Sequence, residues 1–157
     1  MLSLSTGQKL ALLEAVDVLE DSIDFLIVDT GAGINDNVVY FNLAAQERLL
    51  VITPEPTSLT DAYALIKVMK IRHGVERFHV LVNMAKNEKA AKDIFAKLYN
   101  ACDHFLSGVS LDYVGFLPHD PTVRQAVMHQ KPFSSFAPSS EASLAMDQPE
   151  RLEVVLD

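Results

Sequence analysis

Four short apolar runs, each followed by a polar or proline-rich loop, set the pattern of this chain. Each run holds four or five residues, mostly β-branched, aromatic or leucine, and the runs lie at 25–28, 49–53, 78–82 and 113–117. The segments between them have the spacing of amphipathic helices. Strands that alternate with helices predict a parallel sheet of right-handed βαβ units. We therefore expect an α/β fold with a Rossmann-like parallel sheet of about four strands and flanking helices.

Capping residues mark the ends of several predicted helices. Asn35 and Asp120 are expected N-caps, Ser58 opens a capping box, and Gly74 is an expected C-terminal stop. The prolines within 53–58 predict irregular structure there. The expected helices cover residues 9–20, 36–46, 62–72, 86–106 and 121–129.

The length of 157 residues suits one domain with a core of its own. Proline and serine become frequent after Lys131, and the helical pattern weakens there except at 140–146. We therefore expect an α/β domain over residues 1–131 and a loosely structured tail over 132–157.

Charge and composition narrow the classes of function. The 13 basic and 21 acidic residues give a net charge of −8, which is a poor match for nucleic acid or for anionic lipid. The segment 148–157 lacks the basic face of a membrane-binding helix. No apolar run approaches the roughly 18 residues of a membrane span, and no signal peptide is visible. We expect a cytoplasmic protein with no nucleic-acid partner and no membrane binding.

The lone Cys102 and the five histidines suggest no chemistry of their own. One cysteine excludes an internal disulfide, and its place on a predicted helix favours a packing role. The histidines do not have the spacing of metal ligands.

The polar loops after the four predicted strands form the candidate site. They begin at Asp29, Thr53, Asn83 and Pro118. The carboxyl ends of parallel strands share one edge of the sheet, which is where ligands bind in open α/β folds. A carboxylate at the position of Asp29 is suited to hold Mg²⁺ through water beside nucleotide phosphates. The alternative is that Asp29 only caps the strand end or the next helix.

Several of these loops resemble a known family. The sequences DTGAGI at 29–34 and EPTSLTDAYALIK at 55–67, followed by Asn83 and by PHD at 118–120, are similar to the MinD/ParA group of ATPases. This group is the deviant Walker-A class of P-loop proteins, and within it the likeness is strongest to the FlhG family of flagellar-number regulators (FleN or YlxH). The likeness covers about residues 10–131. It implies a P-loop NTPase type of sheet, with ATP or ADP and Mg²⁺ as cofactors.

The resemblance implies roles at the phosphate end of the site. Asp29 corresponds to the carboxylate that holds Mg²⁺ through water, and Gly31 and Gly33 to the switch that senses the γ-phosphate. Asp61 matches an acidic position in the segment that faces a partner subunit, and it is the candidate catalytic residue. The alternative for Asp61 is an ordinary acid near the positive end of a helix.

The resemblance also implies contacts to the base. Asn83 and Asp120 match residues that read the adenine edge, Pro118 one that packs against the base, and Arg124 lies on the helix that follows. The alternatives are a strand-end turn residue at Asn83 and a simple N-cap at Asp120.

One motif of the family is not found in this sequence. Relatives carry the phosphate-binding loop K-G-G-x-x-x-K-T/S, whose backbone amides and lysine hold the phosphates. We therefore expect the chain to correspond to the C-terminal part of such an ATPase, incomplete relative to the family, and not to hydrolyse ATP alone. Two alternatives stay open, a protein-interaction module with a dead nucleotide site and a half-site ATPase completed by another chain.

The partners implied are a second copy of the chain or another protein, and flagellar proteins such as FlhF by family resemblance. In relatives the strand that precedes the phosphate-binding loop lies between the strands at 25–28 and 49–53. Without it, we expect these two strands to pair directly or a partner to cover the open edge.

Overall fold

The computed structural model describes residues 5–18 and 22–147, in two compact units. Unit 1 is Met1–Ala45 and unit 2 is Gln46–Asp157. The predicted absence of a basic membrane-binding face at 148–157 lies outside the described residues. Within the described part of the chain, no helix is long and apolar enough to cross a membrane.

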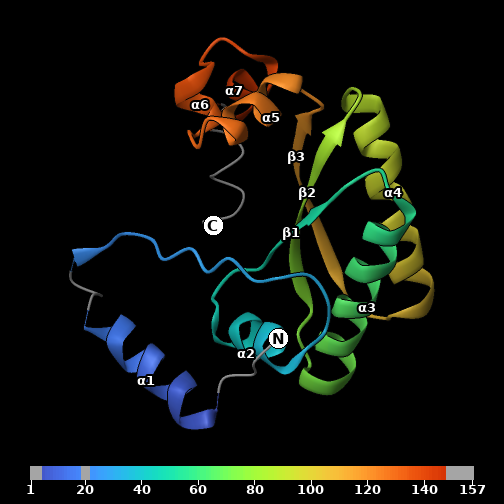
Figure 1. The fold of residues 1–157 in the computed structure, drawn as a ribbon. Helices are drawn as coiled ribbons and strands as arrows, with labels where there is room; N and C mark the ends of the chain where they lie inside the picture. The colour runs from blue at the N-terminus through green and yellow to red at the C-terminus, as the bar shows by residue number, and fades with distance from the viewer. Residues whose placement is uncertain (1–4, 19–21, 148–157) are drawn as a thin grey trace. The chain divides into compact units, whose positions relative to one another are not determined.

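Unit 2 is built on a parallel sheet of three strands, in the order β1 (Leu49–Ile52), β2 (Arg77–Ala85) and β3 (Ser110–Pro118) (Figure 1). Each strand was expected from its apolar run, and β2 and β3 extend beyond their runs at both ends. All three strands point the same way, so their carboxyl ends lie at one edge of the sheet. The predicted parallel α/β fold is therefore confirmed.

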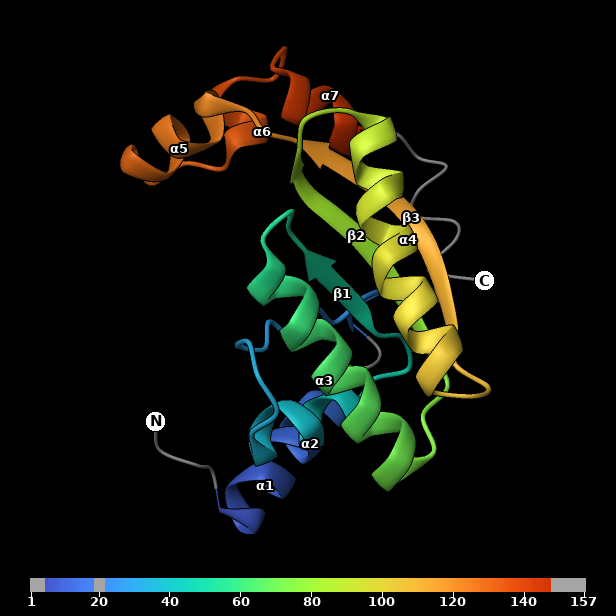
Figure 2. The same cartoon turned by 90° about the vertical axis from the view of Figure 1, so that its right-hand side faces the viewer.

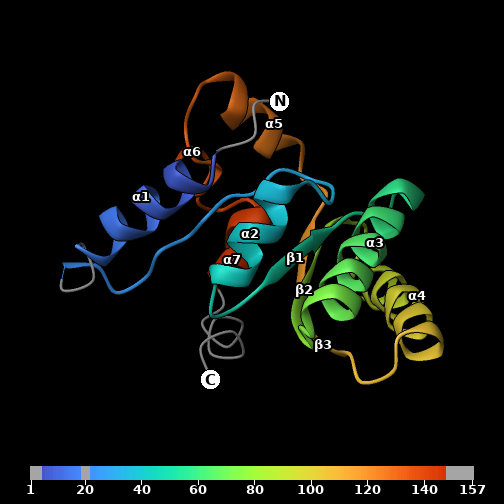
Figure 3. The same ribbon diagram turned by 90° about the horizontal axis from the view of Figure 1, so that it is seen from below.

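Helices α3 (Pro56–His73) and α4 (Glu88–Phe105) cover one face of this sheet (Figures 2 and 3). The buried side of α4 is the stripe Ala91, Ile94, Leu98 and Cys102, at helical spacing. Burial of this kind stabilises by roughly 1.5–3 kcal/mol for each large apolar side chain. The sheet contributes fully buried Phe78, Val80 and Val82 to the same core.

Three short helices follow β3 and lie beyond its carboxyl end (Figure 1). They are α5 (Pro121–Met128), α6 (Phe133–Phe136) and α7 (Glu141–Met146). Helix α7 packs against β3, and α6 contacts both α5 and α7. The helices predicted at 121–129 and 140–146 are confirmed, while the domain boundary after residue 131 stays a prediction.

Unit 1 holds α1 (Thr6–Asp17) and α2 (Asp36–Ala44). Asn35 caps α2 as expected, because its side chain accepts hydrogen bonds from the amides of Asn37 and Val38, each at 3.1 Å. Helices α1 and α2 each begin and end within a few residues of the predicted bounds, which are 9–20 and 36–46.

The strand predicted at 25–28 is wrong. These residues are extended but form no strand, and their side chains are exposed, with Phe25 at 66% and Ile27 at 90%. A strand exists only by hydrogen bonding to a neighbour, and no described strand pairs with this run. The described sheet therefore has three strands, not about four. Among the described strands, β1 pairs with β2 alone.

The predicted start of α3 is also wrong. The helix begins at Pro56 instead of near Ala62, with Pro56 in the first turn. Proline is tolerated there because the amide it lacks has no partner within a helix anyway. Ser58 is accordingly not an N-cap. The end of α3 is as expected, since Gly74 is left-handed at φ +69° and its amide donates to the carbonyl of Lys70.

Candidate functional site

The carboxyl edge of the sheet brings together the ends of β2 and β3. The amide of His119 donates to the carbonyl of Ala85 at 3.0 Å, and Ala85 is opposite Pro118 in the register. The predicted base-contact residues Asn83, Pro118 and Asp120 are therefore on neighbouring strand ends of one unit. All three are partly buried.

The end of β2 has an unusual backbone. The register between β2 and β3 shifts between Val82 and Ala85, and Met84 has a φ of +58°. The amide of Met84 donates to Asn83 Oδ1 at 2.9 Å. This bond uses one lone pair of Asn83 Oδ1, so Asn83 can offer a ligand its Nδ2 amide as a donor and the other lone pair of Oδ1 as an acceptor. A left-handed methionine stores strain, of the kind that concentrates near functional sites.

Asp120 ties three segments together. Its Oδ1 accepts from the hydroxyl of Thr122 at 2.6 Å and from the amide of Thr122 at 2.9 Å, and its Oδ2 accepts from the amide of Ala142 at 3.1 Å. These bonds, led by that from the Thr122 hydroxyl, lower the pKa of Asp120 to about 2. The N-cap role is confirmed, and both oxygens already have partners. Contact with adenine stays a prediction for this residue.

The end of β1 is held by a bond that the sequence analysis missed. The amide of Thr53 donates to Ser58 Oγ at 3.0 Å, which joins the strand end to the first turn of α3. The Thr53 hydroxyl is buried without a hydrogen-bond partner. Asp61 lies in the second turn of α3 with an exposed side chain, and Arg124 is exposed on α5. The catalytic role of Asp61 stays a prediction.

The phosphate-end candidates belong to unit 1. Asp29 is exposed at the end of the extended segment, and Gly31 is exposed beside it. Gly33 has a φ of +102°, which side chains rarely adopt, so this turn needs glycine although nothing crowds it. A site that joins Asp29, Gly31 and Gly33 to the edge of unit 2 stays a prediction.

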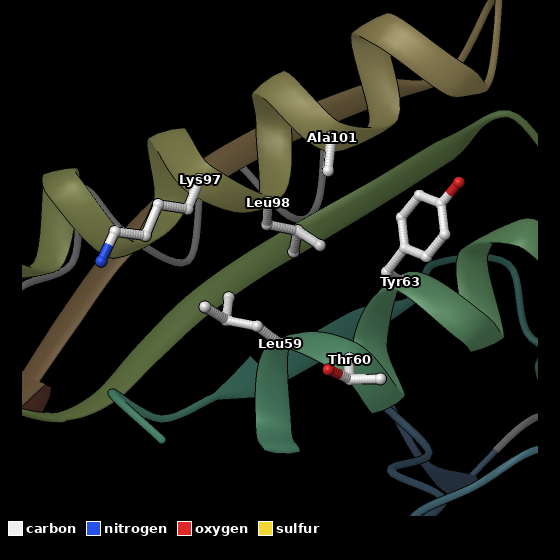
Figure 4. Close-up of a pocket in the computed structure, with 6 residues that line it drawn as sticks. All are labelled: Leu59, Thr60, Tyr63, Lys97, Leu98 and Ala101. Atoms are coloured by element: carbon white, nitrogen blue, oxygen red, sulfur yellow. The ribbon is translucent and has the colours of Figure 1, made fainter. Parts of the chain in front are cut away.

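The structure also has a shallow hollow between α3 and α4, of about 250 Å³ (Figure 4). It is lined by Leu59, Thr60, Tyr63, Lys97, Leu98 and Ala101. None of these is a candidate from the sequence, and the lining is mostly apolar. Among the described residues, no cluster of three histidine, cysteine or acidic side chains is able to hold a metal ion. Burial raises the pKa of the Cys102 thiol to about 11, in line with its expected packing role.

The parallel sheet with its polar loops at the carboxyl edge defines a Rossmann-like α/β protein. A solved structure of the septum site-determining protein MinD from Pyrococcus horikoshii OT3, complexed with Mg-ADP, has the same fold, with a TM-score of 0.66. It is 20% identical in sequence and matches 99% of this chain and 61% of that chain. No protein-family model matches the sequence.

Sequence similarity to curated relatives is more specific than the shared fold. It is 50% identical over 145 residues to the antiactivator FleN of Pseudomonas aeruginosa PAO1, which covers 92% of this chain and 51% of FleN. It is 28% identical over 141 residues to the flagellum site-determining protein YlxH of Helicobacter pylori 26695, which covers 86% of this chain and 47% of YlxH. MinD of Bacillus subtilis 168 is 25% identical over 130 residues, covering 83% of this chain and 47% of that MinD. The chain thus spans about half the length of these relatives. These sequence similarities support a place for the chain in the MinD/ParA group, near the FlhG family that includes FleN and YlxH.

Proposed function

We propose that this chain is part of a regulator of flagellar number or placement, of the FlhG type. The observation that carries this is the 50% identity to the antiactivator FleN across 92% of the chain. The identity to YlxH, whose name describes it as flagellum site-determining, points to the same process.

We test the regulatory role by expressing the chain in a flagellated bacterium that lacks its own FleN-type protein. Flagella are counted by electron microscopy, and the level of the chain is checked by immunoblot. A changed number of flagella per cell, compared with an empty vector, is the expected result. The same number in both strains, with the chain present, contradicts the proposal.

A nucleotide site is the natural extension of this proposal. Asn83 with its free donor group and the partly buried Pro118 fit a flat base at the edge of β2 and β3. Asp29 is the residue for Mg²⁺, held through water, and Mg²⁺ neutralises phosphate charge when bound. Asp120 fits less well, because its oxygens already accept three bonds. The cofactors proposed are therefore ATP or ADP with Mg²⁺.

Binding of these nucleotides by this chain alone is expected to be weak. The amino-acid sequence contains no K-G-G-x-x-x-K-T/S loop to supply phosphate contacts. Phosphoryl transfer depends on positioning and charge neutralisation, so we propose that the chain does not hydrolyse ATP alone.

Titration calorimetry with Mg-ATP and Mg-ADP tests the nucleotide proposal. We expect dissociation constants no tighter than about 1 mM, or roughly −4 kcal/mol. Asp29→Asn is the test variant for Mg²⁺, and Asp24→Asn, also exposed, is its matched control. Micromolar binding contradicts the expectation that the phosphate contacts are missing.

A half-site completed by another chain is the second candidate. It is favoured by β1, whose second edge pairs with no strand in the described residues. Unpaired edges recruit strands from other chains. The proposed partners are a second copy of this chain or a flagellar protein such as FlhF, and Asp61 on the exposed side of α3 is proposed to face such a partner. Restored ATP hydrolysis on mixing with a chain that carries the phosphate-binding loop distinguishes this candidate from an interaction module with a dead site.

A further inference from the structure

A fully buried histidine lies between two carboxylates in the first half of β2. His79 Nε2 is 2.9 Å from Glu47 Oε2, and His79 Nδ1 is 3.9 Å from Asp112 Oδ2. The His79 side chain has no exposed surface. Asp112 is opposite His79 in the register of β3, and Glu47 comes two residues before β1. One imidazole ring therefore connects the segment that enters β1 with the far strand of the sheet.

The two ring nitrogens are in different situations. An ionised carboxylate only accepts hydrogen bonds, so the bond to Glu47 places a hydrogen on Nε2. In the neutral ring, Nδ1 is then a bare acceptor that faces a second carboxylate, and it has no hydrogen-bond partner. A proton on Nδ1 converts this repulsion into attraction and gives the bond to Glu47 the added strength of a charged donor.

Other charged groups around the ring modify this arrangement. Arg77 Nε donates to the same Asp112 Oδ2 at 2.9 Å and so shares that carboxylate with His79. Arg48 contributes its backbone carbonyl, which accepts the amide of His79 at 2.9 Å. Glu47 and Asp112 are thus acidic side chains paired with the ring, and Arg77 pairs with Asp112 in turn.

The position of Glu47 in the chain gives the contact its significance. Unit 1 ends at Ala45 and unit 2 begins at Gln46, so Glu47 is the second residue of unit 2. Its bond to His79, and the bond between the Arg48 carbonyl and the His79 amide, hold the place where the connecting chain enters the sheet.

We propose that His79 is a proton-operated latch for this entry point. The neutral ring holds Glu47 through one nitrogen. The protonated ring holds Glu47 and attracts Asp112 as well, which fastens the segment 46–48 more firmly to the sheet.

Hydrogen exchange of the His79 amide in the full chain, followed by NMR, tests the latch. This amide exchanges only when its bond to the Arg48 carbonyl opens. Glu47→Ala removes the acceptor of the ring, and loss of such a bond is expected to speed exchange by about tenfold. Glu88→Ala is the matched control, because it removes an equal charge from an exposed pair with Lys92. Equal exchange in the two variants overturns the proposal.

The pH dependence of this exchange distinguishes the effect of protonating the His79 ring from the effect of its hydrogen bond to Glu47. After correction for the intrinsic rate, exchange of the His79 amide in the unmodified chain is expected to slow several-fold when the ring becomes protonated as the pH is lowered. In Glu47→Ala this difference is expected to shrink. Glu47→Gln keeps the shape of the side chain and is expected to give an intermediate result. An unchanged pH difference in both variants overturns the role of the proton.

Discussion

Among single side chains, Asp120 joins the end of β3 to two of the helices that follow it. Its carboxylate caps α5 and also accepts the amide of Ala142 at the start of α7. These bonds are stronger to the ionised group than to the protonated one, which is why the pKa of Asp120 falls to about 2 from an ordinary value of 3.8. Since the folded pKa lies below the unfolded one, this stabilisation is complete above about pH 4 and is lost as the pH falls through about 2.

We expect Asp120→Ala to lower the free energy of unfolding at neutral pH, because three donors lose their acceptor. The difference from the unmodified chain is expected to shrink as the pH falls from about 4 to about 2. Urea unfolding followed by circular dichroism at several pH values gives both quantities. A difference that stays constant down to pH 2 contradicts the ionised role of Asp120.

Met84 is the residue where the backbone carries strain. Its φ of +58° suits glycine, and its side chain is 47% exposed, so little packing compensates the conformation. Met84→Gly is therefore expected to raise the free energy of unfolding by about 1 kcal/mol. Met84→Val is expected to lower it, because a β-branched side chain tolerates this φ even less. The midpoints of urea unfolding measure both changes. A Met84→Gly variant that is less stable than the unmodified chain contradicts the proposed strain at Met84.

At the residue scale, the sequence predicts what depends on near neighbours. Asn35 and Asp120 cap helices that start at the next residue, so their local context was enough. The bond from Ala142 to Asp120 spans 22 residues, and that from Glu47 to His79 spans 32. Nothing in the pattern of the chain marks such pairs. The run Asp120-Pro121-Thr122 did contain a signal for the missed Thr122 hydroxyl, two residues after its cap.

Among the helices and strands, the first turn of α3 is joined by a hydrogen bond to the end of β1. Ser58 Oγ accepts a hydrogen bond from the amide of Thr53. The side chain therefore binds the end of the preceding strand and does not cap the helix. Ser58→Ala leaves that partly buried amide without its acceptor and is expected to cost about 1–2 kcal/mol of unfolding free energy. Thr57→Ala, at an exposed neighbouring position, is the matched control and is expected to change little. Similar urea midpoints for the two variants contradict this role of Ser58.

Whether a predicted strand forms depends on whether a neighbouring strand pairs with it. The runs at 49–53, 78–82 and 113–117 all find parallel partners and become β1, β2 and β3. The run at 25–28 has equally apolar residues, yet its side chains stay exposed and no described strand pairs with it. Composition predicts the ability to form a strand, while pairing depends on what else is present. This is why the type of sheet was predicted correctly, while three of the four predicted strands are found in the described sheet.

For the whole molecule, unit 2 contains what an independent domain needs. All three strands lie in it, and Val38 is the one residue of the described apolar core that lies outside it. Its helices α3 and α4 bury a continuous face against the sheet, and α7 closes onto β3. Parallel strands joined by helices can bury such a core within one unit.

We therefore expect residues 46–157 alone to fold cooperatively. Deleting residues 1–45 is expected to leave the helical circular dichroism of unit 2 and a single urea transition, with a midpoint close to that of the same core in the full chain. The separate segment 1–45 is expected to lack a cooperative transition, because its apolar residues at 25–28 have no described partner strand. If residues 46–157 unfold without cooperativity, or only regain it when 1–45 is added in trans, then β1 depends on unit 1 for its stability. The second outcome also identifies the segment that covers the open edge of the sheet.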